Sequence, residues 1–530
     1  MNSTALLYCG HRLTTGGLMA SSIIRGKYVV TKALNGQSSE IIQDGAVFQR
    51  DGEIIEVGKF EEVRRKHRAD KVVGSEKQVV IPGLVNAHHH VGLTPFQLGN
   101  LDLALEPWIA VRMANRDVDP YLDTLYCAIQ MVEFGITTVM HNHATHRKMP
   151  GMSFQEGGAA VIKAYQDAGM RVAFSFSHRD QNQIVYQEDQ AFLKTLPKEL
   201  ASKLEQRLKV SHLPTKEYLG VVNDVYRQFQ EDPRVRVFVS PGNVQWCSDS
   251  MLEGMKEYAS RRRTGLHIHL QESIYQKMYG LRTWGKTPLA HLNDVGVLGP
   301  EVSCAHGVWV TESDIDTMAA TGTMVSHNAS SNLRLKSGVA PVNRMNAKGV
   351  MVAIGIDEAG LNDDKDMMQE MRLVSKIHRE PGVSAAWPSS HQVLHMATVN
   401  GAKATFFAPQ VGTLEKGKRA DMVLVNLEHI MEPYLDPDTN IVDAILYRAR
   451  GVDVDTSIVD GEVIMEGRKM TRVKKEDVWR ELKAHMGRPL APHEQERREV
   501  SKQLLPHVQR FYEKWELGKG RPHYFYNEAG

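Results

Sequence analysis

The stretch IPGLVNAHHHVGL, residues 81–93, places three consecutive histidines directly after a short apolar run. Successive side chains of a strand alternate between its two faces, so His88 and His90 share one face while His89 points the other way. Two imidazoles at this spacing can supply two ligands to a metal ion, provided that other parts of the chain supply the rest. The stretch therefore predicts a strand that ends at a metal site.

Seven further apolar runs follow, separated by longer helix-like segments. They are GITTVMHNHA, GMRVAFSFSH, RVRVFVSPG, GLHIHLQES, EVSCAHGV, GTMVSHNAS and GVMVAIGIDE. Several begin with glycine, and most end in polar or ionisable residues. Eight alternations of strand and helix predict an α/β fold, a (β/α)8 TIM-type barrel, whose chemistry lies at the C-terminal ends of its strands. A doubly wound open sheet is the competing fold, but the GxGxxG fingerprint of a dinucleotide binder is missing.

Short strands and turns flank this region on both sides. Asp51-Gly52 and Asp460-Gly461 each lie between apolar alternations, which indicates tight hairpins. We expect both flanks to form one small composite β-sandwich domain, into which the barrel is inserted. The predicted division is an extension over 1–22, the small β-domain over 23–80 and 406–470, the barrel over 81–405, and a helical C-terminal extension over 471–530. Pro489 and Pro492 predict a helix break within that extension.

The composition is typical of a globular protein with a large core, since 42% of the 530 residues are hydrophobic and 24% are charged. With 64 basic and 63 acidic residues, the formal net charge is +1. No overall field therefore attracts nucleic acid or an anionic membrane, and we expect neither as a partner. A small-molecule substrate is the better expectation.

Four cysteines (Cys9, Cys127, Cys247 and Cys304) are widely spaced and form no CxxC pair. Neither a disulfide framework nor a thiolate zinc site is expected. The first residues lack the pattern of a signal peptide, and no stretch approaches the roughly 20 apolar residues of a membrane span. These features predict a cytoplasmic protein.

If the barrel forms, six ionisable side chains meet at its mouth from the ends of four strands: His88, His90, His269, Glu272, His306 and Asp357. Neutral imidazoles and a carboxylate suit Zn²⁺, with Fe²⁺ or Mn²⁺ as alternatives, and leave a position for water. Such a metal lowers the pKa of a bound water from roughly 15.7 to about 7. Hydrolytic chemistry is therefore expected.

Six motifs resemble, in order, the signatures of the amidohydrolase superfamily, in its cytosine deaminase-like and chlorohydrolase-like branch. They are PGLVNAHHH, LHIHLQES, CAHGV, SHNASSNLRLKSGVAP, GIDEAGLNDDKDM and VGTLEKGKRADMVLVN. The resemblance covers residues 23 to 470. The resemblance identifies the superfamily specifically, but it constrains the identity of the substrate much less.

The resemblance implies that one divalent metal ion per subunit is bound by His88, His90, His269 and Asp357. Glu272 would take a proton from the water and pass it to the leaving nitrogen, which requires a raised pKa. His306 would hydrogen-bond the nucleophilic water or polarise the substrate, and Asp357 would also accept a proton. The strand RVRVFVSPGNVQW offers no lysine to bridge two metals, so one metal is favoured.

Polar residues after the remaining strands are expected to border the pocket. The candidate substrate contacts are His143, Gln245, Trp246, His327 and Asn328, with His141, Asn142 and Cys247 beside them. The alternative for each is loop capping and hydrogen bonding. We expect His267 to support a metal ligand and His89 to be structural, and Glu358 is either a pocket acid or a solvated neighbour.

The expected function is a metal-dependent hydrolase of a non-peptide C–N bond, most simply an aminohydrolase acting on an N-heterocycle or amidine-like carbon. The alternatives are an amidase-like hydrolase of a urea, carbamate or cyclic amide, a dechlorinating or C–S cleaving relative, and a non-catalytic assembly protein. Asn243 stands near the place where many deaminases of this branch carry a histidine, which argues against a standard purine or pyrimidine substrate. The resemblance also implies a homo-oligomer.

Overall fold

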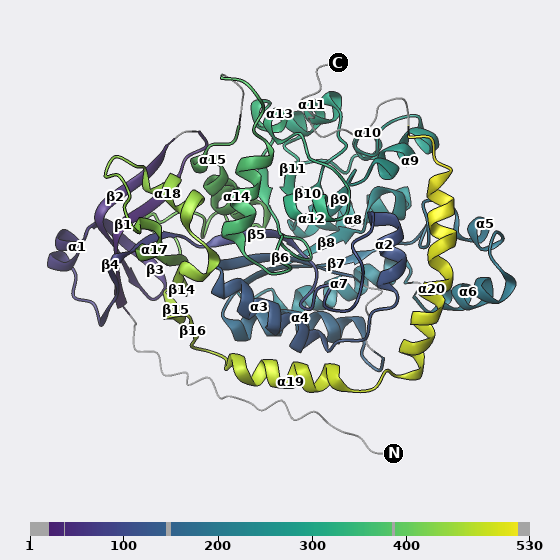
Figure 1. Ribbon diagram of the computed structural model, residues 1–530, viewed down its shortest axis with the longest axis horizontal. Helices are drawn as coiled ribbons and strands as arrows, with labels where there is room; N and C mark the ends of the chain where they lie inside the picture. Colours follow the sequence, from purple (N-terminus) through teal and green to yellow (C-terminus); the bar gives the residue numbers. More distant parts are fainter. Residues whose placement is uncertain (1–20, 37, 145–149, 212, 384–386, 518–530) are drawn as a thin grey trace.

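The computed structural model describes residues 21–36, 38–144, 150–211, 213–383 and 387–517 (Figure 1). Most of the predicted N-terminal extension, including Cys9, lies outside these residues. Within them, Cys127, Cys247 and Cys304 are free and buried. No helix in the described part of the chain is both long enough and apolar enough to cross a membrane.

Eight parallel strands form the central sheet, in the order β12-β11-β10-β9-β8-β7-β6-β5. They are β5 (Leu84–His89), β6 (Ile136–Ala144), β7 (Arg171–His178), β8 (Val235–Pro241), β9 (Leu266–Leu270), β10 (Val302–His306), β11 (Met324–His327) and β12 (Val352–Ile354). Each corresponds to one of the eight apolar runs. The first and last strands meet where His89 bridges Asp357 in parallel, and the Asp357 N–H donates to the His88 carbonyl at 2.9 Å. The sheet thus closes, which confirms the predicted barrel.

Helices connect consecutive strands and surround the barrel (Figure 1). Between β5 and β9 they are α2 (Leu105–Arg112), α3 (Pro120–Glu133), α4 (Phe154–Ala168), α5 (Asp189–Leu193), α6 (Lys198–Ser211), α7 (Thr215–Phe229), η2 (Val244–Trp246) and α8 (Asp249–Arg262). From β9 onward they are α9 (Ile274–Trp284), α10 (Pro288–Asp294), α11 (Glu312–Thr321), α12 (Ala329–Arg334), α13 (Val342–Ala347), α14 (Met367–Ile377), α15 (Ser390–His395), η3 (Met396–Asn400) and α16 (Gly401–Ala404). Local sequence fixes several ends: α4 begins at a capping box of Ser153 and Glu156 and ends at Gly169, whose φ is 85°.

The barrel strands are buried on both faces, and β9 shows why. Leu266, Ile268 and Leu270 belong to the hydrophobic cluster shared with the surrounding helices. The alternate residues, His267 and His269, contact histidines of the β5 segment across the barrel. The period of two along the strand therefore directs apolar side chains outward and imidazoles inward.

Strands from both ends of the chain form a second sheet, in the order β16-β15-β14-β13-β4-β1-β2-β3. They are β1 (Ser21–Ala33), β2 (Ser39–Arg50), β3 (Glu53–Lys59), β4 (Lys71–Pro82), β13 (Met422–Asn426), β14 (Val454–Val459), β15 (Glu462–Glu466) and β16 (Lys469–Met470), with α1 (Phe60–Lys66), α17 (Glu428–Met431), α18 (Ile441–Arg448) and η4 (Gly451–Asp453) alongside. β4 pairs with β1 in parallel and with β13 antiparallel, which joins the two flanks. The Ile54 N–H donates to the Lys418 carbonyl at 2.8 Å, so the sheet curls and its strands share one core. The composite small domain is present as expected.

Both predicted hairpins are formed at Asp-Gly pairs. Asp51 and Gly52 have φ values of 54° and 79°, and Asp460 and Gly461 have φ values of 50° and 72°. Two successive positive φ angles are the mark of the tight hairpin turn that asparagine, aspartate and glycine favour. The first segment of the small domain was predicted over 23–80; its strands run from Ser21, where β1 begins, to Pro82, where β4 ends.

Two helices follow the small domain, α19 (Lys475–Gly487) and α20 (Pro492–Glu513), separated near the predicted break. In Figure 1 α19 runs along the lower side of the barrel, and α20 stands toward the right, in contact with α2 and α6. Val500, Leu504 and Val508 of α20 share a hydrophobic cluster with Leu200 and Leu204 of α6. The C-terminal extension is therefore packed onto the barrel.

Candidate metal centre and active site

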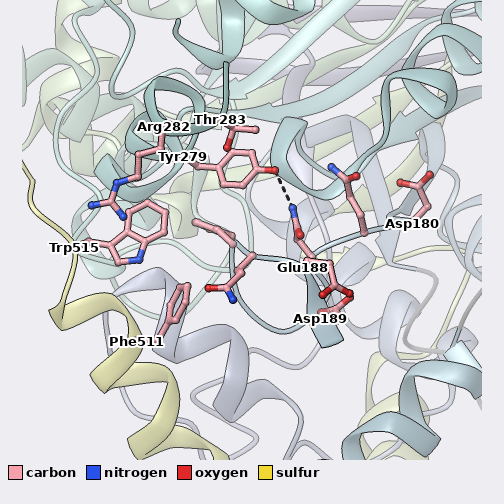
Figure 2. Close-up of a pocket in the computed structure, with 12 residues that line it drawn as sticks. Asp180, Glu188, Asp189, Tyr279, Arg282, Thr283, Phe511 and Trp515 are labelled. Carbon is pink, nitrogen blue, oxygen red and sulfur yellow. Dashed lines mark hydrogen bonds between the residues drawn. The ribbon is translucent and has the colours of Figure 1, made fainter. Parts of the chain in front are cut away.

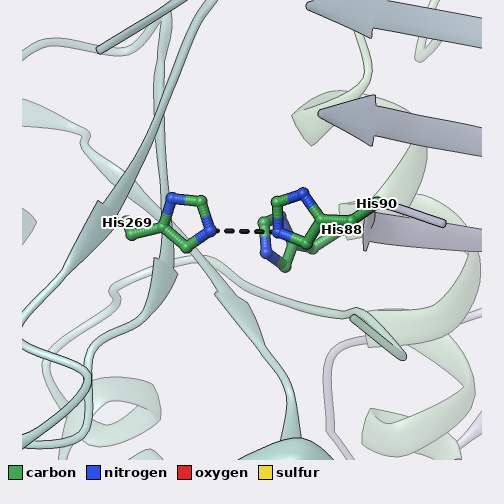
Figure 3. Close-up of side chains that lie close together, drawn as sticks. All are labelled: His88, His90 and His269. Atoms are coloured by element: carbon green, nitrogen blue, oxygen red, sulfur yellow. Dashed lines mark hydrogen bonds between the residues drawn. The ribbon is translucent and has the colours of Figure 1, made fainter. Parts of the chain in front are cut away.

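Three histidines predicted as ligands point toward one another from two strands (Figure 3). His88 lies near the end of β5, His90 follows that strand, and His269 lies in β9. The Nε2 atoms of His90 and His269 are 3.1 Å apart. One ligand atom from each of the three lies within 4.8 Å of the others, as required for binding one ion.

Hydrogen bonds on the far side of two rings fix their tautomers. His90 Nδ1 donates to the Asn142 carbonyl at 2.6 Å, and His269 Nδ1 donates to the Gly242 carbonyl at 2.7 Å. Burial and neighbouring imidazoles lower the pKa of His90 well below its usual value and that of His269 to about 4, so both rings are neutral at pH 7. Their Nε2 atoms then face each other as two acceptors, an arrangement that a cation between them stabilises.

Asp357 completes the set of donors. Its Oδ1 lies 3.6 Å from His88 Nε2 and 3.4 Å from His90 Nε2, and its Oδ2 accepts a hydrogen bond from Ser331 Oγ at 2.5 Å. Four ligands about 2.0–2.1 Å from a tetrahedral metal stand about 3.3 Å from one another, which matches these separations. His88 Nε2 is buried and has no hydrogen-bond partner among the described residues. The residues present therefore fit a divalent metal ion.

Backbone strain marks the strand ends that carry the site. Gln271, His306 and Asp357 have φ values of 43°, 75° and 59°, in the left-handed region that non-glycine residues seldom occupy. Each residue follows or ends a barrel strand, where the chain must turn sharply. Backbone strain of this kind costs free energy and persists only where the surrounding structure enforces it, and it clusters at functional sites.

Glu272 lies on the same cavity, two residues after β9. Its backbone N–H donates to Gln276 Oε1 at 2.7 Å, and its Oε2 is 3.7 Å from His306 Nε2. Burial, together with the charges of Asp357 and Glu106, raises the pKa of Glu272 well above its usual value. The carboxyl group can therefore hold a proton near neutral pH, as a proton shuttle requires.

His306 presents one ring nitrogen to this cavity. Its Nδ1 is 2.8 Å from Asn332 Oδ1, and this bond leaves Nε2 free to accept. Burial lowers the pKa of His306, so the ring is neutral. An accepting nitrogen 3.7 Å from the Glu272 carboxyl can orient a water molecule between the two.

Two further histidines have the supporting positions expected of them. His267 Nε2 is 2.7 Å from His88 Nδ1 and so fixes the orientation of that ring. His89 turns away from the cluster, and its Nδ1 is 2.8 Å from the Asp357 carbonyl. Glu358 forms an ion pair with Arg112 at 2.6 Å, so this acid belongs to the pocket and is not solvated.

The cluster opens into a cavity of about 850 Å³. Among the candidate substrate contacts, His143 and Trp246 line it, and His141 does as well. Gln245, His327 and Asn328 are buried and do not line it. His327 Nε2 is instead 2.9 Å from His378 Nε2, and Asn328 Nδ2 is 3.3 Å from His306 Nδ1. These placements give Asn328 a supporting position and provide no support for substrate contact by Gln245 or His327.

Several residues on or beside this cavity were not anticipated. Ser331 and Asn332 lie within the motif SHNASSN, and polar residues in the first turn after a strand could have identified them. Glu106 is buried, accepts hydrogen bonds from Ser273 and Tyr186, and has its pKa raised by burial to about 7. Among the arginines of the cavity wall, Arg179 directly follows β7, and its strand-end position could have identified it. The others lie in or beside helices, where no sequence pattern marks them.

A second cavity, of about 590 Å³, lies beside α20 (Figure 2). Tyr279, Arg282, Phe511 and Trp515 form one side of it, with the Arg282 guanidinium 4.1 Å from the Trp515 ring centre. The carboxylates on the other side accept hydrogen bonds from neighbouring backbone N–H groups. No histidine is among its described lining residues, whereas the candidate metal ligands line the first cavity.

Comparisons with known proteins agree with this geometry. A model of the amidohydrolase family matches residues 79–464. The 5′-deoxyadenosine deaminase of Methanosarcina acetivorans is 31% identical over 88% of this chain and 97% of its own length. The 5-methylthioadenosine/S-adenosylhomocysteine deaminase of Caldanaerobacter subterraneus subsp. tengcongensis is also 31% identical, over 78% of this chain and 88% of its own length.

Solved structures show the same fold. An adenosine deaminase from Xanthomonas campestris with bound zinc superposes with a TM-score of 0.73 at 22% identity, covering 88% of this chain and 98% of that one. Atrazine chlorohydrolase from Arthrobacter aurescens with zinc gives a TM-score of 0.73 at 20% identity, covering 87% and 99%.

Proposed function

This chain belongs to the amidohydrolase family, and we propose that it is a metal-dependent aminohydrolase that replaces an amino group of an N-heterocycle by oxygen and releases ammonia. It is thus a hydrolase of carbon–nitrogen bonds other than peptide bonds. One observation carries the proposal: a buried glutamate with a raised pKa adjoins a cluster of neutral Nε2 atoms and a carboxylate. This pairing suits a leaving group that must be protonated before it departs.

Four side chains would hold the metal: His88, His90, His269 and Asp357. When bound, the metal would supply Lewis acidity and a nucleophile near pH 7, since it lowers the pKa of a water to about 7. The His306 Nε2 would accept a hydrogen bond from that water and aim it at the ring carbon. Ser331 holds one Asp357 oxygen, which leaves the other directed at the His88 and His90 rings.

Glu272 would carry the proton from the attacking water to the leaving nitrogen. A bond from oxygen to carbon forms, the C–N bond breaks, and the departing nitrogen takes the proton and leaves as ammonia. The Glu272 backbone is fixed by its hydrogen bond to Gln276, and its carboxyl group is buried. The carboxyl group therefore stays in place between taking the proton from water and giving it to the nitrogen. Arg112 and Glu358, which pair on the cavity wall, would flank the heterocycle.

The finer parts of the proposal rest on the relatives. We take zinc as the metal, since two similar structures were solved with zinc. We take 5′-deoxyadenosine as the first substrate to test, because a relative 31% identical is named as its deaminase, and we give this more weight than the argument from Asn243 against a purine. Iron and manganese are the alternatives to compare. A cytoplasmic location agrees with the free buried cysteines, and a homo-oligomer can be tested by light scattering after size-exclusion chromatography.

The deciding experiment combines ammonia detection with mass spectrometry of the products. The zinc-loaded protein is offered adenine nucleosides, amino-triazines, ureas and carbamates. Ammonia release with exchange of an amino group for oxygen supports the proposal. Release of an amine with opening of an acyl or ring bond would instead establish the amidase-like alternative.

A further inference from the structure

The cavity extends well beyond the metal centre. It runs from His90, His269 and Glu272 outward to α6 and α20. At about 850 Å³ it lies near the upper end of the roughly 300–1,000 Å³ typical of small-molecule sites. It therefore has room for a substituent attached to the reacting heterocycle.

Arginines are numerous on the wall of this cavity, and three of them are engaged. Arg112 pairs with Glu358 at 2.6 Å, and Arg497 pairs with Asp117 at 2.6 Å. Arg116 donates to two backbone carbonyls near the end of α19, each at 2.5 Å. These guanidinium groups stabilise the wall itself.

Two other guanidinium groups on the wall have no hydrogen bond or ion pair within the part of the chain that the structure describes: Arg179 and Arg207. The Arg179 guanidinium lies 5.2 Å from the ring centre of Trp246, which also lines the cavity. Burial, with the charges of Arg497 and Arg179, lowers the pKa of Arg207 to about 10. Positive charges held together and partly desolvated are unfavourable unless an anion joins them.

The two free arginines reach the cavity from different elements, since Arg179 directly follows β7 and Arg207 lies in α6. Arg112 pairs with Glu358, the residue after the candidate ligand Asp357, and therefore stands beside the metal centre. Arg207 comes from α6 and feels Arg179 and Arg497, with no metal-centre group among its influences. The acids whose charges act on these two arginines are engaged elsewhere. Asp117, which acts on Arg207, binds Arg497 and His493. Asp189, which acts on Arg179, accepts a hydrogen bond from the Ile184 N–H at 3.1 Å.

We propose that Arg179 and Arg207 bind an anionic group, a carboxylate or a phosphate, on the part of the substrate remote from the reacting heterocycle. Guanidinium groups bind both anions through paired N–H donors. The inference rests on the proposed function, since it describes the same cavity and the same substrate. Because Arg207 lies in α6, this helix would contribute directly to substrate specificity.

The first test is independent of turnover. Inorganic phosphate is titrated against the metal-loaded protein while the thermal midpoint is followed for wild type, Arg207→Gln and Lys209→Gln. Lys209 is a matched control, because it is exposed on the same helix and pairs with Glu205 at 3.3 Å. A phosphate-dependent rise in wild type and Lys209→Gln that is lost in Arg207→Gln supports the site. No rise in wild type, or an equal rise in Arg207→Gln, overturns it.

The second test separates the anionic group from the heterocycle. kcat/KM is compared for 5′-deoxyadenosine, which is uncharged, and for S-adenosylhomocysteine and adenosine 5′-monophosphate, which carry a carboxylate and a phosphate. Arg207→Gln should lose about tenfold or more on whichever anionic compound is preferred, and little on 5′-deoxyadenosine. An equal loss on all three compounds would overturn the inference.

The two tests also distinguish this inference from the proposed function. A phosphate-dependent rise without ammonia release from any amino-heterocycle supports the anion site and contradicts the aminohydrolase. Ammonia release without any phosphate-dependent rise supports the aminohydrolase and contradicts the anion site.

Discussion

The carboxyl group of Glu272 lies where burial and the charges of Asp357 and Glu106 all oppose its ionisation. Ser273, the next residue, donates to Glu106, whose other hydrogen bond comes from Tyr186. Gln276 accepts a hydrogen bond from the Glu272 backbone N–H and donates one to Tyr186, so the two glutamates belong to one network of hydrogen bonds. A proton held here is available to the cavity and protected from bulk water.

Glu272→Gln should retain the metal and lose turnover by about 10²–10⁴-fold, because the amide cannot carry the proton. Metal content by mass spectrometry and ammonia release measure the two effects. Glu481→Gln, an exposed position on α19, serves as the control and should leave both unchanged. A near-normal rate in Glu272→Gln would exclude the shuttle.

His269→Ala should lower metal occupancy, since it removes one of three converging imidazoles. His429→Ala, in the small domain, is the matched loss of an imidazole remote from the cavity and should bind metal normally. Occupancy is measured after dialysis against limiting zinc. Unchanged metal content in His269→Ala would remove this residue from the ligand set.

At the scale of elements, a buried ion cluster joins the barrel to the small domain. Arg171 begins β7, is fully buried, and pairs with Asp421 at 2.7 Å and with Asp460. Arg234 and Arg419 also bind Asp460, at 2.6 Å and 2.5 Å. Asp460 is the turn residue of the second hairpin, so that hairpin is tied to the N-terminal end of the barrel, opposite the cavity.

Asp460→Asn should destabilise the protein at pH 7 by about 2 kcal/mol, with activity retained in the folded fraction. Burial opposes ionisation, but the charges of Arg171 and Arg234 outweigh it and lower the pKa of Asp460 from 3.8 to about 2. Because the folded pKa is depressed, this stability is present above pH 3.8 and is lost as the pH falls toward 2. Urea unfolding of wild type and variant at pH 7 and pH 3 checks this, and a difference that grows toward pH 3 would contradict it.

At the scale of the whole molecule, α19 and α20 carry the chain from the small domain around the barrel to its mouth (Figure 1). Leu504 of α20 is 1% exposed and contacts the cluster that includes Leu200 and Leu204 of α6. Together α6 and α20 wall the outer cavity. The C-terminal extension therefore helps to shape the site, although it contains no chemical motif.

Leu504→Ala should loosen α6 and α20 and leave the barrel intact, because truncating a buried leucine removes about 2–5 kcal/mol from its own cluster. Hydrogen exchange should become faster in both helices, with β9 and β10 unchanged. Lys502→Ala, exposed on the same helix, is the control. Uniformly faster exchange across the barrel strands would show that the helices are not a separate unit.

The sequence predicted the barrel, the family and the hydrolase class correctly, because the strands are short apolar runs, most of which end in polar or ionisable residues. It also placed His88, His90, His269 and Asp357 at one mouth, since parallel strands present their ends together. It could not decide which face a terminal residue takes: His327 ends β11 but turns to His378, which directly follows α14. Arg207 was missed because only the packing of α6 against α20 brings it to the cavity.

The seam at which the barrel closes coincides with the metal centre. The hydrogen bond from the Asp357 N–H to the His88 carbonyl joins the first strand segment to the last, and both residues are candidate ligands. A growing chain that has not yet reached Asp357 thus has an open sheet and an incomplete ligand set at the same time. Closure of the barrel and completion of the ligand set depend on the same residue, so metal supply and folding yield are expected to rise and fall together.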